Sequence, residues 1–325
     1  MQTELSSKLG KRMPAATLSI IIPTYNGACQ EVFPNIPPLL ESLREQAPSG
    51  EIILVDSSKT DGFLSQIAER YHSKIYRIQQ HEFDHGRTRM LAGKIASSEI
   101  LVFVSHDIVL EDKHAIEKLI EPFSRDKKVA AVYGRQLPHA NASDFAAHLR
   151  HFNYPDTSHV KSLEDKHRYG IKTPFMSNGF AAYRRSALEE IGWFKDKLIM
   201  SEDTYAGAKL LLRGYKIAYA AEACVHHSHN YSLLEEFKRY FDIGVFHRQE
   251  KWIVQEFGVA EGEGSKYVKS GLAFLVAKRN YYMIPAFVIR SIAKYVGYQL
   301  GLHYGLLPKA VIRQISMHRN WWKNG

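Results

Sequence analysis

Short apolar runs alternate with segments of helical periodicity along about the first hundred residues of this 325-residue chain. The runs are rich in β-branched residues, as buried strands are, and lie at residues 17–22, 51–56, 74–78 and 100–104. The segments between them carry apolar residues at helical spacing and lie at residues 36–46, 63–71 and 88–96. Because strands and helices alternate, the pattern predicts an α/β fold with a parallel-rich sheet flanked by crossover helices.

The alternation weakens after about Tyr133, and helical segments predominate beyond Tyr231. We expect further helices at residues 112–123, 205–213 and 233–252. The pattern divides the chain into three parts. They are an N-terminal extension at residues 1–16, an α/β domain at 17–252 and a helical C-terminal appendage at 253–325.

Polar residues follow the predicted strands at the points where the strands end. Pro23, Thr24, Tyr25 and Asn26 follow the first strand, and Asp56 ends the second. In open α/β sheets, ligands bind beyond the carboxyl ends of the strands. A carboxylate at such an end can accept hydrogen bonds from a nucleobase or a ribose, although it can equally cap the next helix. The chain has neither a G-x-G-x-x-G nor a Walker sequence, which disfavours dinucleotide and ATP sites.

His106 and Asp107 follow the fourth strand, and three histidines follow one another closely at residues 226–229. The Asp107 carboxylate could hold a divalent cation against a diphosphate, or it could cap the helix predicted at 112–123. In an extended segment His227 and His229 face the same side, so both could contact one metal ion or phosphate.

Two acidic residues, Glu202 and Asp203, precede the helix predicted at 205–213. Together with Ser201 they could stabilise the start of that helix by capping and by the helix dipole. Alternatively, one carboxylate could act as a general base on a hydroxyl nucleophile. Further along, Arg239 and Arg248 could clamp a phosphate or form a solvated helix face. The sequence leaves these alternatives open.

The positive charge is concentrated at the C-terminus. The net charge of the chain is +9, and residues 264–325 carry ten basic and no acidic residues. The same segment is rich in Tyr and Trp, which favour the headgroup zone of a membrane. Its longest uncharged run, residues 295–308, is shorter than the ~20 apolar residues that cross a bilayer. We therefore expect an appendage that binds an anionic membrane surface, with a basic packing or dimerisation helix, and hence a homodimer, as the alternative.

Other classes of protein fit less well. The basic residues of the appendage are spaced through apolar segments, and this disfavours nucleic acid as a partner. The two cysteines, Cys29 and Cys224, exclude a disulfide scaffold. The apolar run near the N-terminus is too short for a signal sequence and breaks at Pro23. We expect a cytoplasmic protein.

The order of these motifs resembles that of the family 2 glycosyltransferases, which have the GT-A fold. The motifs that carry the resemblance are IIPTYN at 21–26, VDSS at 55–58, SHD at 105–107 and SED at 201–203. Further motifs resemble the bacterial rhamnosyltransferase subgroup. They are FDHGRTR at 83–89, YGRQ at 133–136, FNYP at 152–155, SN at 177–178 and HSHNY at 227–231.

The resemblance implies roles for the candidate residues. The nucleotide-sugar site would comprise Pro23, Thr24, Tyr25, Asn26, Asp56, Arg89, His106, Asp107, Asn178 and Arg239. Asp107 would bind a divalent metal, Mg²⁺ or Mn²⁺, with His227 or His229. Asp203, next to Glu202, would be the base that deprotonates the acceptor hydroxyl. The chain departs from the family pattern at Ser105, where the first aspartate of D-x-D usually stands, and at His106 and Met90.

The function implied by the resemblance is an inverting transfer of a 6-deoxyhexose. The donor would be dTDP-L-rhamnose, and the acceptor a lipid-linked glycan at the inner face of the bacterial cytoplasmic membrane. Two alternatives stay open. The chain could use a UDP- or GDP-sugar, or it could be a nucleotide-sugar-binding protein that has lost catalysis.

Overall fold

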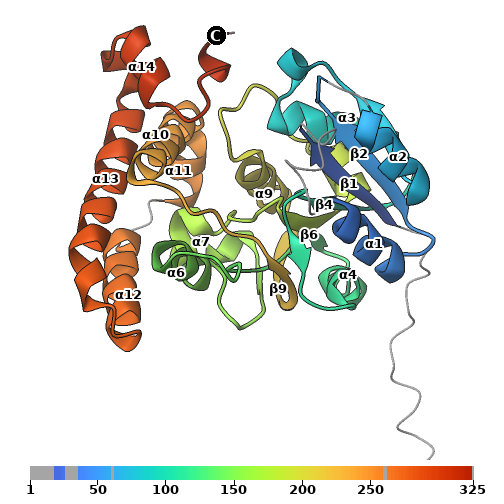
Figure 1. Cartoon of the computed structure of the whole chain (residues 1–325), viewed down its shortest axis with the longest axis horizontal. Helices are drawn as coiled ribbons and strands as arrows, with labels where there is room; N and C mark the ends of the chain where they lie inside the picture. Colours follow the sequence, from blue (N-terminus) through green and yellow to red (C-terminus); the bar gives the residue numbers. More distant parts are fainter. Residues whose placement is uncertain (1–17, 26–35, 60–61, 259–261, 324–325) are drawn as a thin grey trace, which may run out of the picture.

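A computed structural model describes residues 18–25, 36–59, 62–258 and 262–323, and its strands form one sheet (Figure 1). The strands are β1 (Leu18–Thr24), β2 (Glu51–Asp56), β3 (Lys74–Arg77), β4 (Ile100–Val104), β5 (Val109–Leu110), β6 (Val129–Leu137), β7 (His159–Lys161), β8 (Phe180–Arg184) and β9 (Lys216–His226). Their order across the sheet is β3-β2-β1-β4-β8-β6-β9-β5, and β7 pairs with β9. The predicted α/β fold is confirmed.

The first half of the sheet is parallel, as the alternation predicts. Strand β1 pairs in parallel with both β2 and β4, and β2 pairs in parallel with β3. The connecting helices are α1 (Ile36–Gln46), α2 (Gly62–Arg70) and α3 (His85–Ile95). Helix α3 begins earlier than expected because Asp84 is its N-cap, accepting a hydrogen bond from the backbone N–H of Arg87.

The second half of the sheet is mixed and was not predicted. Strand β8 runs antiparallel to both β4 and β6, whereas β9 is parallel to β6. The helices here are α4 (Ala115–Ile120), α5 (Pro122–Arg125), α6 (Asp144–Asn153), α7 (Lys166–Tyr169), α8 (Arg185–Glu190) and α9 (Glu202–Leu212). The single helix expected at 112–123 is therefore wrong. The second short helix, α5, begins with Pro122. Proline lacks a backbone N–H, and this costs nothing at the first position of a helix, because an N–H there would have no partner within the helix.

Two apolar clusters, one on each face of the sheet, form the core. Successive residues of β1 alternate between them: Ile20 and Ile22 belong to one cluster and Ile21 to the other. Helices α1, α2 and α4 contribute to the first cluster, and α3 and α9 contribute to the second. This packing holds the carboxyl ends of β1, β2 and β4 side by side.

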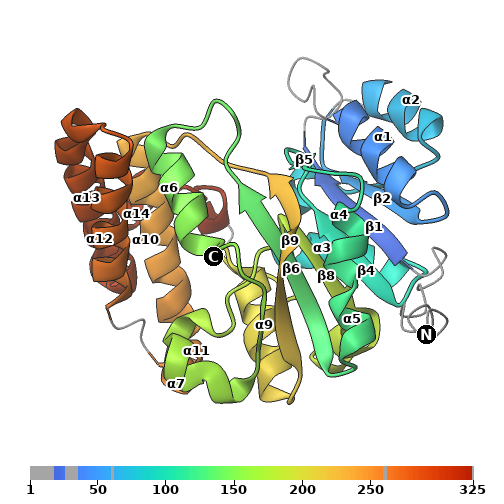
Figure 2. The same cartoon turned by 90° about the horizontal axis from the view of Figure 1, so that it is seen from below.

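The C-terminal helices form a layer on one side of the sheet (Figures 1 and 2). They are α10 (Leu233–Gln249), α11 (Lys251–Phe257), α12 (Glu263–Ala277), α13 (Ile284–Leu302) and α14 (Lys309–Ile315). Glycines let α10 and α13 approach closely, since a Cβ at Gly301 would lie 2.0 Å from the Phe241 carbonyl oxygen. A further apolar cluster joins Phe145 of α6 to Phe287 of α13. The predicted boundary at 252/253 falls within α11, so the division into domain and appendage remains a prediction.

None of the helices in the described residues combines the length and apolar character that crossing a membrane requires.

Candidate active site

A small cavity of about 120 Å³ lies beyond the carboxyl ends of β1 and β4. It is lined by Pro23, Thr24, Tyr25, Phe83, His85, Arg89, Ser105, His106 and Asp107. Six of the predicted nucleotide-sugar residues are thus brought together, among them Asp107, which is also the predicted metal ligand. Asn26, which the sequence also places here, lies outside the described residues. Phe83 and His85 were not singled out as site residues, although both belong to the FDHGRTR motif at 83–89.

Hydrogen bonds tie Asp56 and Pro23 to residues that line this cavity. The Thr24 hydroxyl donates to Asp56 Oδ1 over 3.1 Å, and the Ser58 hydroxyl donates to the same oxygen over 2.6 Å. Asp56 is 2% exposed and caps no helix, because α2 begins only at Gly62. A His106 ring nitrogen contacts the Pro23 carbonyl oxygen at 3.3 Å and so ties the end of β4 to the end of β1.

The two acidic residues at the start of α9 lie in a buried hydrogen-bonded network. Glu202 Oε1 pairs with Arg89 Nη1 at 2.9 Å. Asn178 donates its backbone N–H to Asp203 Oδ2 over 3.1 Å and its side-chain N–H to Glu202 Oε1 over 3.1 Å. The Tyr183 hydroxyl donates to Asn178 Oδ1 over 2.6 Å and orients that amide. Asn178 therefore contacts both carboxylates.

Of the capping alternative, the part that concerns the Ser201 side chain is wrong. Ser201 precedes α9 with φ at 64°, in the left-handed region, and its side chain caps no N–H. Such a conformation is uncommon for a residue other than glycine. It places Glu202 and Asp203 at the first positions of the helix, where the dipole favours negative charge.

The neighbouring carboxylates have opposite pKa shifts. Burial raises the pKa of Asp203, and the adjacent negative charge of Glu202 adds to the effect, to about 7. Burial also opposes ionisation of Glu202, but the positive charge of Arg89, the charge of His85 and the hydrogen bond from Asn178 together outweigh it and lower the Glu202 pKa. Glu202 is thus the anion paired with arginine, whereas Asp203 can bind and release a proton near neutral pH.

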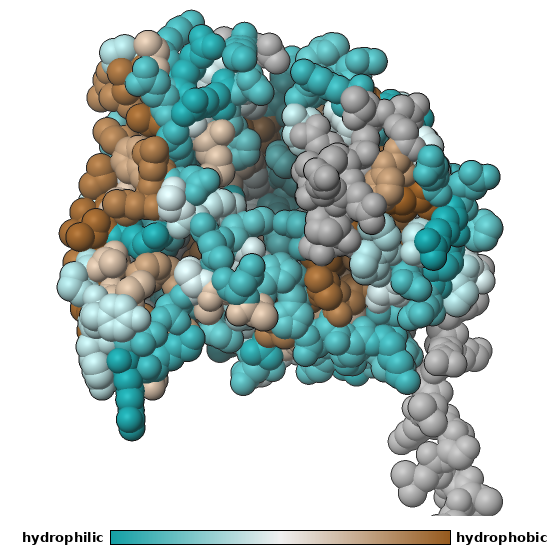
Figure 3. Space-filling view, viewed as in Figure 1, coloured by the Kyte–Doolittle hydropathy of each residue, from teal (hydrophilic) through white to brown (hydrophobic). Residues whose placement is uncertain are grey.

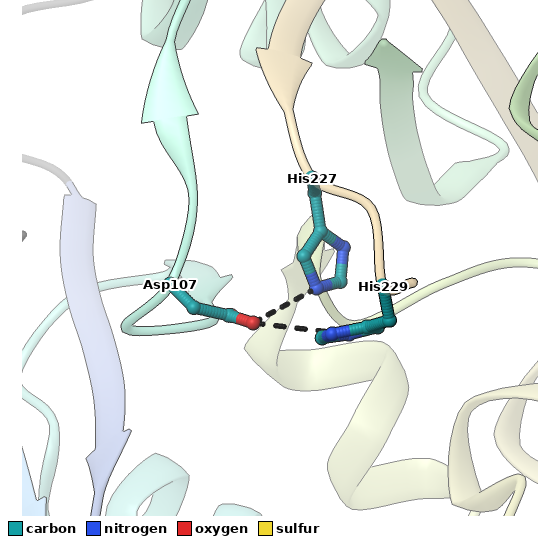
Figure 4. Close-up of side chains that lie close together, drawn as sticks. All are labelled: Asp107, His227 and His229. Atoms are coloured by element: carbon teal, nitrogen blue, oxygen red, sulfur yellow. Dashed lines mark ion pairs between the residues drawn. The ribbon is translucent and has the colours of Figure 1, made fainter. Parts of the chain in front are cut away.

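Asp107, His227 and His229 form a separate cluster (Figure 4). Asp107 Oδ2 lies 3.4 Å from His227 Nε2 and 3.8 Å from His229 Nε2. The strand β9 ends at His226, and the extended segment after it places both rings on the side of Asp107, as alternation predicts. Asp107 is not a helix cap.

The geometry of this cluster fits a divalent cation. One ligand atom from each of the three residues lies within 4.8 Å of the others. Ligands at about 2.0–2.3 Å from one ion lie at such separations from each other. Burial alone would raise the pKa of Asp107, but the adjacent His227, together with His106 and His229, holds it well below its ordinary value. Burial, with the charge of His227, lowers the pKa of His229 to about 4, which leaves that ring neutral as a ligand must be.

A second, open and polar cleft of about 460 Å³ adjoins the cluster and shares His229 with it. Its lining consists of His139, Asn141, Ser228, His229, Asn230, Tyr231 and Glu235. The guanidinium of Arg239 lies 5.8 Å from the ring centre of Tyr231, so this predicted residue lies beside the cleft. Arg248 is exposed and fits the solvated-face alternative.

The chain is similar to known glycosyltransferases in sequence. Residues 19–192 match the family model described as glycosyl transferase family 2. The chain is 43% identical over 309 residues to the O-antigen chain rhamnosyltransferase RfbN of Salmonella typhimurium, covering 94% of this chain and 96% of that protein. It is 44% identical over 318 residues to the O-antigen chain rhamnosyltransferase WbaN of Salmonella anatum, covering 96% and 97%.

Solved structures with the same fold have more distant sequences. A mannosyltransferase, PcManGT from Pyrobaculum calidifontis in complex with GDP-Man and Mn²⁺, aligns with a TM-score of 0.56 at 17% identity, covering 94% of this chain and 84% of that one. TarS residues 1–349 of S. aureus, in complex with UDP-GlcNAc, aligns with a TM-score of 0.53 at 17% identity, covering 93% and 84%. At this identity the likeness concerns the fold alone.

Proposed function

Since this chain belongs to the family 2 glycosyltransferases, we propose that it transfers L-rhamnose from dTDP-L-rhamnose to a lipid-linked glycan precursor with inversion at the anomeric carbon. The observation that carries this proposal is the identity of 43% and 44% to two proteins named O-antigen chain rhamnosyltransferases, over nearly the full length of the chain. The site geometry supports the reaction type.

In the proposed reaction Asp203 is the general base. The acceptor oxygen forms a bond to the anomeric carbon of the donor while the bond from that carbon to the diphosphate breaks, and the hydroxyl proton passes to Asp203. A pKa of about 7 suits this task, because the group is substantially ionised at neutral pH and still basic enough to take a proton. The backbone N–H of Asn178 holds the Asp203 carboxylate in place, and Glu202 beside it is paired with Arg89.

Asp107, His227 and His229 would hold a divalent metal ion. Such an ion would stabilise the negative charge that develops on the departing diphosphate. We infer Mn²⁺ rather than Mg²⁺, because two imidazole nitrogens suit Mn²⁺ better than Mg²⁺, which prefers oxygen ligands.

The nucleoside would occupy the cavity beyond β1 and β4. The Asp56 carboxylate, held by Thr24 and Ser58, would accept a hydrogen bond from the base or the ribose. Arg89 and His106 line the same cavity and would face the sugar phosphate. The choice of dTDP over UDP or GDP rests on the named relatives.

The acceptor would approach from the membrane. Figure 3 shows apolar side chains along α13. The exposed ones on and beside this helix are Tyr281, Tyr282, Val288, Ile289, Ile292, Tyr295, Val296 and Leu306. Exposed basic residues flank them at Lys278, Arg279, Lys309 and Arg313. Both features suit an anionic headgroup layer, which would make the protein peripheral at the inner face of the cytoplasmic membrane.

Not every basic residue of the appendage is available to a membrane. Arg290 and Lys294 point inward from α13 and pair with Glu236 of α10, at 2.8 Å and 3.3 Å. The exposed basic residues Lys278, Arg279, Lys309 and Arg313 lie before and after the apolar stripe in the sequence. The stripe would insert while the basic residues contact the lipid headgroups.

The donor is tested by calorimetric titration of the purified protein with dTDP, UDP and GDP, each with Mn²⁺ and with chelator. We expect the tightest binding for dTDP, and binding that depends on Mn²⁺. Transfer is then followed with dTDP-L-rhamnose and membranes that carry the undecorated glycan. Preference for UDP or GDP would refute the proposed donor, and binding without transfer or donor hydrolysis would favour the non-catalytic alternative.

The membrane surface is tested by flotation with vesicles of phosphatidylcholine containing about 30% phosphatidylglycerol. The wild-type protein should float with these vesicles and not with pure phosphatidylcholine, and Ile289→Asp with Ile292→Asp should abolish flotation. Ile95→Asp, which changes an exposed apolar residue of α3, is the matched control. Should the double variant float normally and instead lower the molecular mass measured by light scattering, the stripe would be a homodimer interface.

A further inference from the structure

Gln136, at the carboxyl end of β6, is a buried amide with partners at both ends. The residue is 1% exposed. Its Oε1 lies 2.6 Å from Arg150 Nη1 and 3.1 Å from His227 Nδ1, and its Nε2 lies 2.9 Å from Ser177 Oγ. The YGRQ motif at 133–136 contains this residue, but the sequence assigns it no role.

The hydrogen-bonding chemistry of these partners fixes a hydrogen on Nδ1 of His227. A guanidinium has donors and no acceptor, so the group of Gln136 that faces Arg150 must be its carbonyl oxygen. The same oxygen faces His227 Nδ1, and that nitrogen must therefore carry a hydrogen in order to donate. In the neutral imidazole the lone pair is then on Nε2, the nitrogen that faces Asp107 at 3.4 Å.

The other tautomer would compete with metal binding. If Nε2 of His227 carried the hydrogen, it could donate to Asp107 Oδ2, and both atoms would be lost as ligands. The packing around Gln136 also holds the ring in place. A Cβ at Gly179 would lie 2.8 Å from Gln136 Nε2 and 3.2 Å from His227 Nδ1, so a glycine at this position lets the amide and the ring meet.

We propose that Gln136, supported by Arg150, is a positioning residue that fixes the Nε2 lone pair of His227 toward Asp107 and so prepares the metal site. The inference rests on the proposed metal site and adds the group that sets its tautomer. Outer partners of this kind typically change metal affinity by about 10- to 100-fold. The same network of hydrogen bonds reaches Asp203. The other end of the Gln136 amide bonds to Ser177, and the next residue, Asn178, donates its backbone N–H to Asp203.

The test is a titration of the full-length protein with Mn²⁺ alone, followed by electron paramagnetic resonance of the free ion. Gln136→Leu should weaken Mn²⁺ binding about tenfold or more. Gln136→Glu keeps an oxygen acceptor for both His227 and Arg150 and should bind within about threefold of the wild type. Ser177→Ala is the matched control, since it removes the bond at the opposite end of the amide and should also leave affinity within about threefold.

Nitrogen-15 NMR of the metal-free protein provides an independent readout. The wild type should show His227 protonated at Nδ1, and Gln136→Leu should shift the ring toward the Nε2-protonated form. Thermal melting identifies a variant that has lost its fold, and in that case Gln136→Asn, an amide too short to reach the ring, takes its place in both measurements.

Two patterns of result would overturn the inference. One is wild-type Mn²⁺ affinity and tautomer in Gln136→Leu, and the other is equal weakening in Gln136→Leu, Gln136→Glu and Ser177→Ala. Asp107→Asn separates this failure from failure of the metal site itself. If Asp107→Asn binds Mn²⁺ as the wild type does, the proposed site is wrong. If only Asp107→Asn loses binding, the site stands and Gln136 does not prepare it.

Discussion

Asp107 is surrounded by imidazoles, whereas Asp203 has a second carboxylate as its neighbour. The neighbouring His227, with the charges of His106 and His229, keeps the pKa of Asp107 low despite burial. At Asp203, burial and the charge of Glu202 act in the same direction and raise the pKa to about 7. The same side chain is thus kept ionised in one place and able to take up a proton near neutral pH in the other, which suits the proposed metal ligand and the proposed base, and the neighbours decide which.

The sharpest test of this difference is to remove the charge at each position. Asp203→Asn should lower the rate of transfer roughly a thousandfold, within the range that a general base contributes, and leave Mn²⁺-dependent donor binding unchanged. Asp107→Asn should lower donor affinity in Mn²⁺ to the level seen with chelator. Steady-state kinetics and calorimetry on both variants make the comparison. Asp203→Asn with more than a tenth of wild-type activity would remove the base assignment.

A second prediction concerns Arg89, the arginine that pairs with Glu202. The side chains of Arg89 and Glu202 are only 9% and 8% exposed, and breaking a buried ion pair leaves an uncompensated charge. Arg89→Leu should lower the free energy of unfolding by about 3 kcal/mol, measured by urea denaturation. Adding Glu202→Leu should recover much of the loss, because the orphaned carboxylate is then absent.

An exposed pair provides the control for this measurement. Arg125 and Glu121 lie on the surface, with 72% and 50% of their side chains exposed. Arg125→Met should change stability by less than about 1 kcal/mol. If Arg89→Leu costs no more than Arg125→Met, the buried pair does not hold Glu202 in its ionised state.

The sequence predicts one half of the fold and only part of the site. Strands β1, β2 and β4 are apolar runs with helices between them, and local pattern is enough to place them. Strand β8 is a five-residue segment that runs directly into α8, and its antiparallel position depends on its neighbours β4 and β6. The contact between Arg89 and Glu202 joins α3 to α9 and depends in the same way on tertiary packing.

Spacing alone brings His227 and His229 to one side, and the structure bears this out. Which ring nitrogen of His227 carries the hydrogen, by contrast, depends on Gln136 and Arg150, which come from two other elements. The raised pKa of Asp203 has a local part, its neighbour Glu202, and a tertiary part, its burial. Residue types thus identify the candidates, whereas the three-dimensional contacts assign their roles.

A third prediction concerns how the stability of the fold changes with pH. It follows from the raised pKa of Asp203. An aspartate in the unfolded chain titrates near pH 3.9, whereas in the folded chain the pKa is about 7. Between these values the folded state binds more protons, so the carboxylate destabilises the fold increasingly as pH rises through this window. Asp203→Asn should therefore gain on the wild type by on the order of 2 kcal/mol between pH 4 and pH 8, a figure reduced for the partial exposure of the group.

This gain is measured as the difference between the two proteins' urea-unfolding free energies at each pH. Any loss of the hydrogen bonds from Asn178 and Thr204 to the carboxylate shifts the curves by a constant, so only the change with pH is informative. Asp107→Asn should show no such gain between pH 4 and pH 8, because the lowered pKa of Asp107 confines its own effect to pH values below about 4. Parallel curves for the wild type and Asp203→Asn would mean that Asp203 titrates as an ordinary aspartate.

The smallest effect expected is also the most direct report on the base. With Mn²⁺ and acceptor saturating, kcat/KM for the donor should rise about tenfold per pH unit below pH 7 and level off above it, since the free enzyme must carry Asp203 ionised. The diphosphate of the donor is esterified at both ends and has no group that titrates there. Burial lowers the pKa of His85 to about 4 and, with the charge of His227, lowers that of His229 to about 4. The titration of these rings therefore does not produce the rise in kcat/KM toward pH 7.

The residual activity of Asp203→Asn should lack the rise in kcat/KM between low pH and pH 7, which is the acidic limb of the profile. A limb that persists in the variant would assign the titration to another group, and a flat wild-type profile from pH 6 to 8 would show that the two aspartates differ less than their surroundings imply.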